Sequence, residues 1–257
     1  LEQVDALDAL FIIGANLRAE LPMLAHRVRK AACRGARVSL LEPAPFTYLF
    51  PVANRISASP ARMRAELAGV LQAALGVAGA SVSAAIAPLL AGVAVNDSQR
   101  AIAASLATGQ RAIWLGALAL RHSAYAELRL LARELARVTG ATLGELLEGA
   151  NAAGAYLAGC LPHRSHAGSQ RPSTGLDARR MLSDPLAGYL LLGTEPWADG
   201  LEPRAAATLK AARFVGAITS YVSPLMLECA HVLLPAAAFA ESSGTYVNLE
   251  GRWQGFA

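Results

Sequence analysis

The sequence predicts an α/β fold, in which βαβ units form mainly parallel sheets covered by helices. Three apolar runs, FIIG, IWLG and LLLG, each end in a glycine, and a helical pattern follows each run. Short apolar runs of this kind are typical of strands that are buried on both faces. Their alternation with helices predicts a sheet that helices cover on both sides.

The first βαβ unit is expected near residues 9–42. ALFIIGAN supplies its first strand, and ARVSLLEP supplies its second. The helix between them has Pro22 in its first turn and closes at Gly35, which suits the preferences of helix ends. One face of this helix is apolar: Leu21, Leu24, Ala25, Val28 and Ala32. The unit is therefore predicted to be Rossmann-like, with a right-handed crossover.

Two further units of the same kind are expected, near residues 111–140 and 187–235. RAIWLGA and AGYLLLG are their first strands, and RFVGAITS and AHVLLP are later strands of the third unit. Residues 141–181 are rich in loop-forming residues and predict an irregular crossover between these units. The 257 residues are interpreted as one fragment of an α/β region from a longer protein.

The composition favours a packed globular region. The chain is 54% hydrophobic and 16% charged, which argues against disorder. Its net charge is +4, but the basic residues are scattered, so a nucleic-acid-binding function is disfavoured. No charged residue occurs from Ala68 to Val95. Because this stretch is mainly Ala, Gly and Ser, we expect buried helices there and no membrane span.

The cysteines predict neither an iron–sulfur cluster nor a zinc site in this chain. Cys33, Cys160 and Cys229 form no CxxC pair, and a sparse, odd number fits a reducing compartment. Cys160 is followed by His163 and His166 at metal-ligand spacing. A site would need a fourth ligand and a rigid support, so coincidence is the favoured interpretation and no metal ligand is assigned.

The glycine-ended strands lie where open α/β sheets bind ligands. GANLRAE could seat a phosphate at the start of the following helix, and Glu42 could accept a hydrogen bond from a ribose hydroxyl. The dinucleotide fingerprint GxGxxG is absent. Tight turns built from small residues explain the same pattern equally well, and no catalytic residue is assigned.

A polar string near the end of the sequence resembles the molybdopterin oxidoreductase superfamily. Members carry a stretch similar to ADVVLP, then a Glu, then GTxxNxEGRxQ. This sequence has AHVLLP and then the matching residues Glu241, Gly244, Thr245, Asn248, Glu250, Gly251, Arg252 and Gln254. IIGANLRAELP is also similar to the G-x-N-P loop of this superfamily.

Within the superfamily, the sequence is most similar to the iron–sulfur subunit of NADH-quinone oxidoreductase (respiratory complex I) that carries a molybdopterin-oxidoreductase-like region. Three segments carry this likeness: LPMLAHRVRKAACRGARV, NAAGAYLAGCLPHR and LGTEPWAD. The resemblance implies a cofactor-free structural domain, in contact with other subunits of the hydrophilic arm and peripheral at the cytoplasmic face of the bacterial inner membrane. The 4Fe-4S and 2Fe-2S clusters of such a subunit belong to its N-terminal part, outside this sequence, and the parent complex would be the oxidoreductase.

Departures from the superfamily pattern support this implication. Ala44 stands where molybdenum enzymes carry the Arg of DPRxT, Leu17 replaces the loop Pro, and His231 replaces the Asp of ADVVLP. The cofactor-binding positions that the resemblance implies are therefore vestigial; they are Gly14, Asn16, Gly244, Thr245 and Asn248. Two alternatives remain open: a fragment of a catalytic molybdenum or tungsten oxidoreductase such as a formate dehydrogenase, and a generic nucleotide-binding module.

Overall fold

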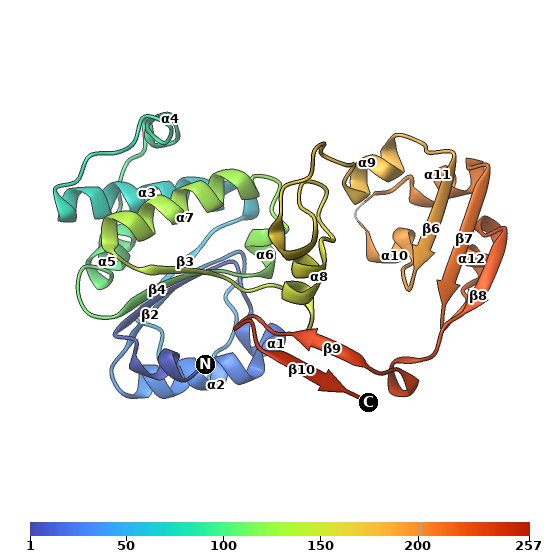
Figure 1. Cartoon of the computed structure of the whole chain (residues 1–257). Coiled ribbons are helices and arrows are strands. Elements are labelled where there is room, and N and C mark those ends of the chain that lie inside the picture. The colour runs from blue at the N-terminus through green and yellow to red at the C-terminus, as the bar shows by residue number, and fades with distance from the viewer. Residues whose placement is uncertain (201) are drawn as a thin grey trace. The chain divides into compact units, whose positions relative to one another are not determined.

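A computed structural model describes residues 1–200 and 202–257 of the chain. The chain divides into two compact units, Leu1–Gly149 and Ala150–Ala257. Figure 1 labels the helices and strands of each unit.

The first unit is built on a five-stranded sheet in which every pairing is parallel. Its strands are β1 Ala9–Ile13, β2 Arg37–Glu42, β3 Asn54–Ser57, β4 Arg111–Leu115 and β5 Thr142–Glu145, in the order β3-β2-β1-β4-β5. The chain moves outward from β1 in one direction and then returns to pair β4 on its other side. The order therefore reverses between β1 and β4, which makes their carboxyl ends the topological switch point.

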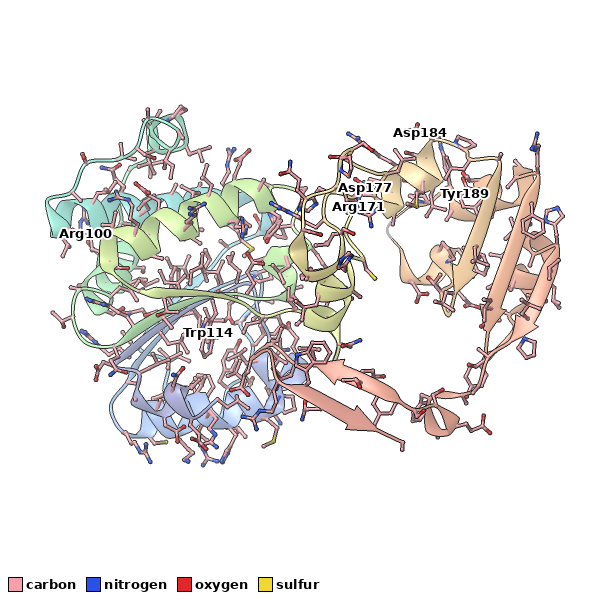
Figure 2. The ribbon with its side chains drawn as sticks, in the orientation of Figure 1. Arg100, Trp114, Arg171, Asp177, Asp184 and Tyr189 are labelled. Atoms are coloured by element: carbon pink, nitrogen blue, oxygen red, sulfur yellow. The ribbon has the colours of Figure 1, made fainter. Side chains whose placement is uncertain are left out.

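Helices cover both faces of this sheet, as the sequence predicts (Figure 1). The elements are η1 Glu2–Ala6, α1 Leu17–Glu20, α2 Pro22–Cys33, α3 Pro60–Ala78, α4 Ala87–Leu90, α5 Asp97–Ser105, α6 Ala117–Leu120 and α7 Tyr125–Thr139. One core lies between the sheet and α3, α5 and α7. A second core lies between the opposite face and α2, and it includes the buried ring of Trp114 (Figure 2).

The predicted first βαβ unit is confirmed, with one difference in its helix. The stretch forms two helices, α1 and α2, which meet at Leu21, and Pro22 occupies the first turn of α2. The charge-free stretch contributes the end of α3 and all of α4, and α3 is buried over much of its length. No helix among the described residues is both long and apolar enough to cross a membrane.

The second unit contains a parallel three-stranded sheet, an antiparallel hairpin and short helices. The strands are β6 Gly188–Leu192, β7 Phe214–Thr219, β8 Val232–Pro235, β9 Gly244–Val247 and β10 Trp253–Phe256. The helices are α8 Ala152–Ala158, η2 His166–Gly168, α9 Ala178–Ser183, α10 Pro196–Asp199, α11 Ala205–Ala211, α12 Pro224–Cys229 and η3 Phe239–Glu241. The sheet order is β6-β7-β8, and β9 pairs with β10.

The three-stranded sheet departs from the expectation that helices cover both faces. Its core contains residues from β6 and β7 together with α9, α11 and α12, and they pack on one face. Leu191 of β6 belongs to this face and is 6% exposed, whereas its neighbours Leu190 and Leu192 are 70% and 72% exposed. Within the described part of the unit, the opposite face of the sheet therefore remains open and apolar.

Residues 141–181 are more ordered than the sequence indicates. The stretch begins with the edge strand β5 and continues with α8, η2 and the start of α9. The strand was not predicted because Thr142–Glu145 is short, contains Gly144 and has no buried apolar run. The remaining residues of this stretch are largely loop, as predicted.

Candidate functional site

The loops after β1 and β4 meet at the switch point of the five-stranded sheet. Gly116 follows β4, and its N–H donates a hydrogen bond of 2.8 Å to the carbonyl of Ile13. A Cβ atom added to Gly116 would lie 2.1 Å from Ala15 Cβ and 2.7 Å from the Gly14 oxygen. The two loops therefore pack backbone against backbone at the place where related sheets bind ligands.

Gly14, a predicted cofactor position, caps a helix of its own chain. It has a φ of 62°, which favours glycine. Its carbonyl oxygen accepts hydrogen bonds from the N–H groups of Leu118 at 2.9 Å and Ala119 at 3.3 Å. These are N–H groups of the first turn of α6, which an incoming anion would otherwise contact. Contacts within the fold therefore already satisfy them.

Asn16, the second predicted position in this unit, is bonded to a carboxylate. Its backbone N–H donates a 2.7 Å hydrogen bond to Oε1 of Glu20, one turn further along the chain. The other oxygen, Oε2, is buried and has no hydrogen-bond partner among the described residues. The negative charge of Glu20 thus lies where GANLRAE was predicted to seat a phosphate, and it would repel one.

Glu42, which could accept a hydrogen bond from a ribose hydroxyl, is also engaged within the chain. It ends β2 and is 1% exposed. Oε2 accepts a 3.3 Å hydrogen bond from the hydroxyl of Tyr48, and Oε1 forms a 3.0 Å ion pair with Arg55 of β3. Burial raises the pKa of the Glu42 carboxyl, while the positive charge of Arg55 acts against this shift. Oε1 makes no hydrogen bond among the described residues despite this ion pair, so a ribose hydroxyl would compete with Arg55 for Oε1 and with Tyr48 for Oε2.

Tyr48 fastens the loop after β2 to the loop after β1. Its hydroxyl lies 2.9 Å from the carbonyl oxygen of Ala15, to which it donates, as well as near Glu42. Burial, followed by the charge of Glu42, raises the pKa of the tyrosine well above its ordinary range. Ala44, which replaces the Arg of the DPRxT pattern, lies in the same loop and is exposed. The loop after β2 therefore contacts the loop after β1 through Tyr48, and it offers a phosphate no positive charge at Ala44.

In the second unit, Asn248 closes the turn between β9 and β10. Its Oδ1 accepts hydrogen bonds from the N–H groups of Glu250 at 3.0 Å and Arg252 at 2.9 Å. Its own N–H donates to the Arg252 carbonyl at 3.1 Å. Gly251 has a φ of 75°, as such a turn requires. The side chain of Asn248 therefore shapes this turn.

Gly244 and Thr245 belong to strand β9 of the same hairpin. Thr245 is exposed and lies opposite Gly255, while Gly244 lies opposite Phe256. Gly244 does not have a positive φ; a Cβ there would lie 2.9 Å from the Phe256 ring. Close packing, and not an unusual backbone angle, is therefore the reason for glycine at this position.

Two motifs that are far apart in the sequence meet at the hairpin. Asn151, from NAAGAYLAGC, accepts a 2.9 Å hydrogen bond from the N–H of Val247 through its Oδ1. A Cβ on Gly154 would lie 2.0 Å from that same oxygen. The spacing of Asn151 and Gly154 is thus explained by contact with β9. By contrast, Gly14 and Asn16 belong to the first unit and Gly244, Thr245 and Asn248 to the second.

Comparison with known proteins identifies the family of the chain. The sequence model of the molybdopterin oxidoreductase family matches residues 1–257 of the chain. The chain belongs to this family. A search of curated proteins gave no match. Among solved structures, the chain is similar to one from the formyltransferase/hydrolase complex of Methylorubrum extorquens, crystallised with methylofuran. The TM-score is 0.59 with 18% identity, over 99% of this chain and 70% of the other.

The residues of this family member at the strand ends do not fit a pterin dinucleotide well. Such a group brings phosphates, which need free N–H groups or cations. In the first unit, Gly14 caps the N–H groups of α6, a carboxylate binds the N–H of Asn16, and Ala44 provides no positive charge. Whether Gly14, Asn16, Gly244, Thr245 and Asn248 contact any cofactor stays a prediction.

The LGTEPWAD loop after β6 is closed in a similar way. Oδ2 of Asp199 accepts hydrogen bonds from the Glu195 N–H at 2.6 Å and from the Thr194 hydroxyl at 3.2 Å. Gly193 has a φ of 56°, and its N–H donates to Ile218 of β7 at 2.9 Å. His231, which replaces the family Asp before β8, accepts the Val215 N–H through Nδ1 at 3.0 Å. The polar groups of the LGTEPWAD loop therefore stabilise the loop itself, and His231, outside this loop, bonds to β7.

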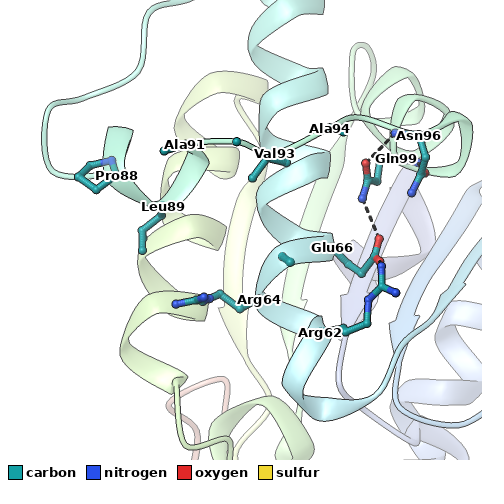
Figure 3. A pocket seen from close by; sticks show the side chains of 12 residues that line it. Arg62, Arg64, Glu66, Pro88, Leu89, Ala91, Val93, Ala94, Asn96 and Gln99 are labelled. Carbon is teal, nitrogen blue, oxygen red and sulfur yellow. Dashed lines mark hydrogen bonds and ion pairs between the residues drawn. The ribbon is translucent and has the colours of Figure 1, made fainter.

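A pocket of about 420 Å³ lies away from the strand ends, between α3 and the segment that joins α4 to α5 (Figure 3). Its polar groups are paired with one another. Glu66 accepts a 2.7 Å hydrogen bond from Gln99 and forms a 3.2 Å ion pair with Arg62. Asn96 and Gln99 form the capping box of α5, and Arg64 pairs with Glu127 at 2.7 Å. These contacts engage the Glu66, Gln99 and Arg64 side chains, so the pocket gives no specific indication of a ligand.

Cys160, His163 and His166 do not assemble into a metal site. Among residues 1–200 and 202–257, no group of three or more His, Cys, Asp or Glu side chains could hold an ion. His166 instead lies 3.3 Å from the hydroxyl of Ser165 through Nδ1. Cys33 and Cys160 are exposed and Cys229 is buried, and all three are free.

The contacts that close the strand ends were not predictable from the sequence. The bond of Glu20 to Asn16 depends on a short helix, α1, that begins directly after Asn16, whereas the helix expected from the sequence has Pro22 in its first turn. Tyr48 and Arg55 carried no recognisable signal, because their contact with Glu42 depends on the path of an irregular loop and on the register of β3. Only Glu42 itself was recognisable, as a carboxylate at a strand end.

Proposed function

We propose that this chain is a cofactor-free scaffold of the molybdopterin oxidoreductase family, within an assembly whose other subunits perform the chemistry. The supporting observation is the state of the switch point in the first unit. There the carboxylate of Glu20 binds the N–H of Asn16, at 2.7 Å, in the position that suits a phosphate. Because Glu20 places a negative charge in an anion site, this contact supports the proposal that the cofactor has been lost. The contacts of Glu42 with Tyr48 and Arg55 support it further.

We further propose that this scaffold is the molybdopterin-oxidoreductase-like region of the iron–sulfur subunit of NADH-quinone oxidoreductase, respiratory complex I. The support is the likeness of three sequence segments and of the 241–254 string. In this role the chain would lie in the hydrophilic arm, peripheral at the cytoplasmic face of the bacterial inner membrane. Iron–sulfur clusters elsewhere in the parent protein would carry electrons from NADH toward quinone, and the scaffold would support them without reacting.

A second assembly is favoured by the comparison of structures. The chain shares its fold, over 99% of its length, with a chain of a formyltransferase/hydrolase complex solved with methylofuran. A scaffold of this kind would serve a formyl-transferring assembly in the same way, since it requires neighbours and no cofactor. A catalytic molybdenum or tungsten oxidoreductase, such as a formate dehydrogenase, is the third alternative, and the closed strand ends are evidence against it.

Metal analysis of the native assembly tests the scaffold proposal. The complex would be isolated from its source cells through a tag on this chain, and molybdenum, tungsten and iron would be measured per mole of chain. We expect less than about a tenth of an equivalent of molybdenum or tungsten. A molybdenum enzyme purified in the same buffers is the positive control. Stoichiometric molybdenum or tungsten would overturn the scaffold proposal in favour of the enzyme.

The same preparation distinguishes the two assemblies. Iron–sulfur subunits together with NADH-dependent quinone reduction are expected for the hydrophilic arm. Formyl transfer or formyl hydrolysis without NADH oxidation is expected for the second assembly. Either result keeps the scaffold role and decides between its two settings, while the isolation of this chain alone, without any partner, would contradict both settings.

A further inference from the structure

A hollow of about 190 Å³ lies beside α2 in the first unit, and we call it the α2 groove. One side is formed by α1 and α2, and the other side by the loop that follows β2. Pro22, Ala25, His26 and Arg29 line the helix side, at the three- and four-residue spacing of one helix face. The groove is smaller than the roughly 300–1,000 Å³ that holds a small-molecule ligand. It has room for a single side chain.

Three basic side chains surround the groove: Arg18, His26 and Arg29. All three are exposed, and among the described residues none of them has a hydrogen bond or an ion pair. Neighbouring cations of α2 behave differently, since Arg27 and Lys30 both bind Asp5 at 3.0 Å. The cations on the other side of the helix are thus neutralised, whereas Arg18 and Arg29 at the groove are available to a negatively charged partner.

The floor of the groove is apolar and firmly held. The rings of Tyr48 and Phe50 are in contact, tilted by 32° with centroids 5.0 Å apart, and Phe50 is buried. The Tyr48 hydroxyl is fixed by Ala15 and Glu42. Leu49, between the two rings in sequence, is 63% exposed. An apolar side chain placed here would cover Leu49 without any rearrangement of the floor, which lowers the entropic cost of binding.

We infer that the α2 groove docks an acidic segment of a partner protein, with one aromatic or aliphatic side chain inserted between the cations. Charge complementarity and the apolar floor together define this partner, because neither a purely acidic nor a purely apolar segment would use both features. A second copy of the chain is disfavoured, since the net charge is +4 and the groove is lined only by basic and uncharged residues. The inference rests on the proposed scaffold role, which requires partner subunits.

Fluorescence anisotropy with labelled seven-residue peptides tests this surface on the full chain. The probe EDEFEDE carries both features, EDEAEDE lacks the apolar side chain, and QNQFQNQ lacks the charge. We expect EDEFEDE to bind at least tenfold more tightly than either of the other two, and to weaken at 0.5 M salt because the contacts are ionic. Equal binding of all three peptides, or no binding, would overturn the inference.

Charge reversal locates the contact. Arg18→Glu with Arg29→Glu should weaken binding of EDEFEDE at least tenfold. The matched control is Arg179→Glu with Arg180→Glu, which changes the net charge equally at exposed positions of α9 and should alter binding less than twofold. Leu49→Ala provides a second variant that keeps the charges and should weaken the Phe peptide alone. Equal effects of the two double variants would overturn the inference.

A membrane surface is the remaining occupant for basic and apolar groups together. Binding of the chain to vesicles of phosphatidylcholine with 30% phosphatidylglycerol would be measured by sedimentation, in the buffer used for the peptide EDEFEDE. A chain that sediments with the vesicles but does not bind the peptide would overturn the inference. These outcomes are independent of the metal analysis. Failure of peptide binding leaves the cofactor-free scaffold intact, and molybdenum in the assembly leaves the measured peptide affinity intact.

Discussion

Glu42 shows how one buried carboxylate connects the closed strand ends with pH-dependent stability. Burial raises the pKa of this carboxyl above its ordinary value of 4.5, with Arg55 acting against the shift. The folded state therefore holds this proton more tightly than the unfolded state. As the pH rises from 4.5 through the raised pKa, the folded state loses stability relative to the unfolded state. Glu42→Gln cannot ionise, so it should remove this loss.

The test is the difference in unfolding free energy between Glu42→Gln and the unchanged protein, from urea titrations at pH 4, 5.5 and 7. We expect this difference to move in favour of the variant as the pH rises. Arg55 stays charged throughout, and its attraction for the ionised carboxylate is already part of the direction of the Glu42 pKa shift, so the trend reports the net effect of burial and of Arg55. Glu2→Gln, at an exposed position, should show no such trend. A difference that does not change with pH would contradict the assignment.

At the scale of elements, the contact between the β1 and β4 loops is the feature that decides the site. Gly116→Ala would place a Cβ 2.1 Å from Ala15 Cβ and 2.7 Å from both Ala15 Cα and the Gly14 oxygen, so the backbone of the β1 loop would have to move. We expect a loss of about 3 kcal/mol or more in unfolding free energy, as for severe overpacking. The control is Gly76→Ala in α3, where a Cβ meets nothing within 4 Å and helix propensity should add about 0.5–1 kcal/mol. Similar values for the two variants would show that the loops do not pack in this way.

What the sequence could predict at this scale follows from the range of the interactions. β1 and β4, and with them α7, were predictable because apolar runs and helical spacing are local patterns. The Asn248 turn was predictable for the same reason, since its bonds span four residues. The contacts of Gly14 with α6, and of Tyr48 with Glu42, depend on how loops from different strands meet. No periodicity encodes that meeting, so the closed state of the candidate site emerged only from the structure.

The whole chain contains two units whose sheets are covered to different extents. The first has apolar cores on both faces of its sheet. In the second, the helices cover one face of β6-β7-β8, and the other face exposes Leu190, Leu192 and Leu234. Parallel sheets are normally buried on both sides. The two units should therefore differ in how well each folds when expressed alone.

We expect residues 1–149 alone to unfold cooperatively on heating, because both cores of the first unit lie within that range. Residues 150–257 alone should bind the dye ANS strongly and aggregate, because the open face of the sheet gains no cover. Leu190→Lys with Leu192→Lys should reduce the dye binding of residues 150–257 by at least half at little cost in stability, since both side chains are largely exposed. Leu191→Ala is the contrasting variant. It should lower the free energy of unfolding by about 2–4 kcal/mol, because the Leu191 side chain is in the core. A non-cooperative melt of residues 1–149, or unchanged dye binding in the double variant, would contradict this account of the two sheets.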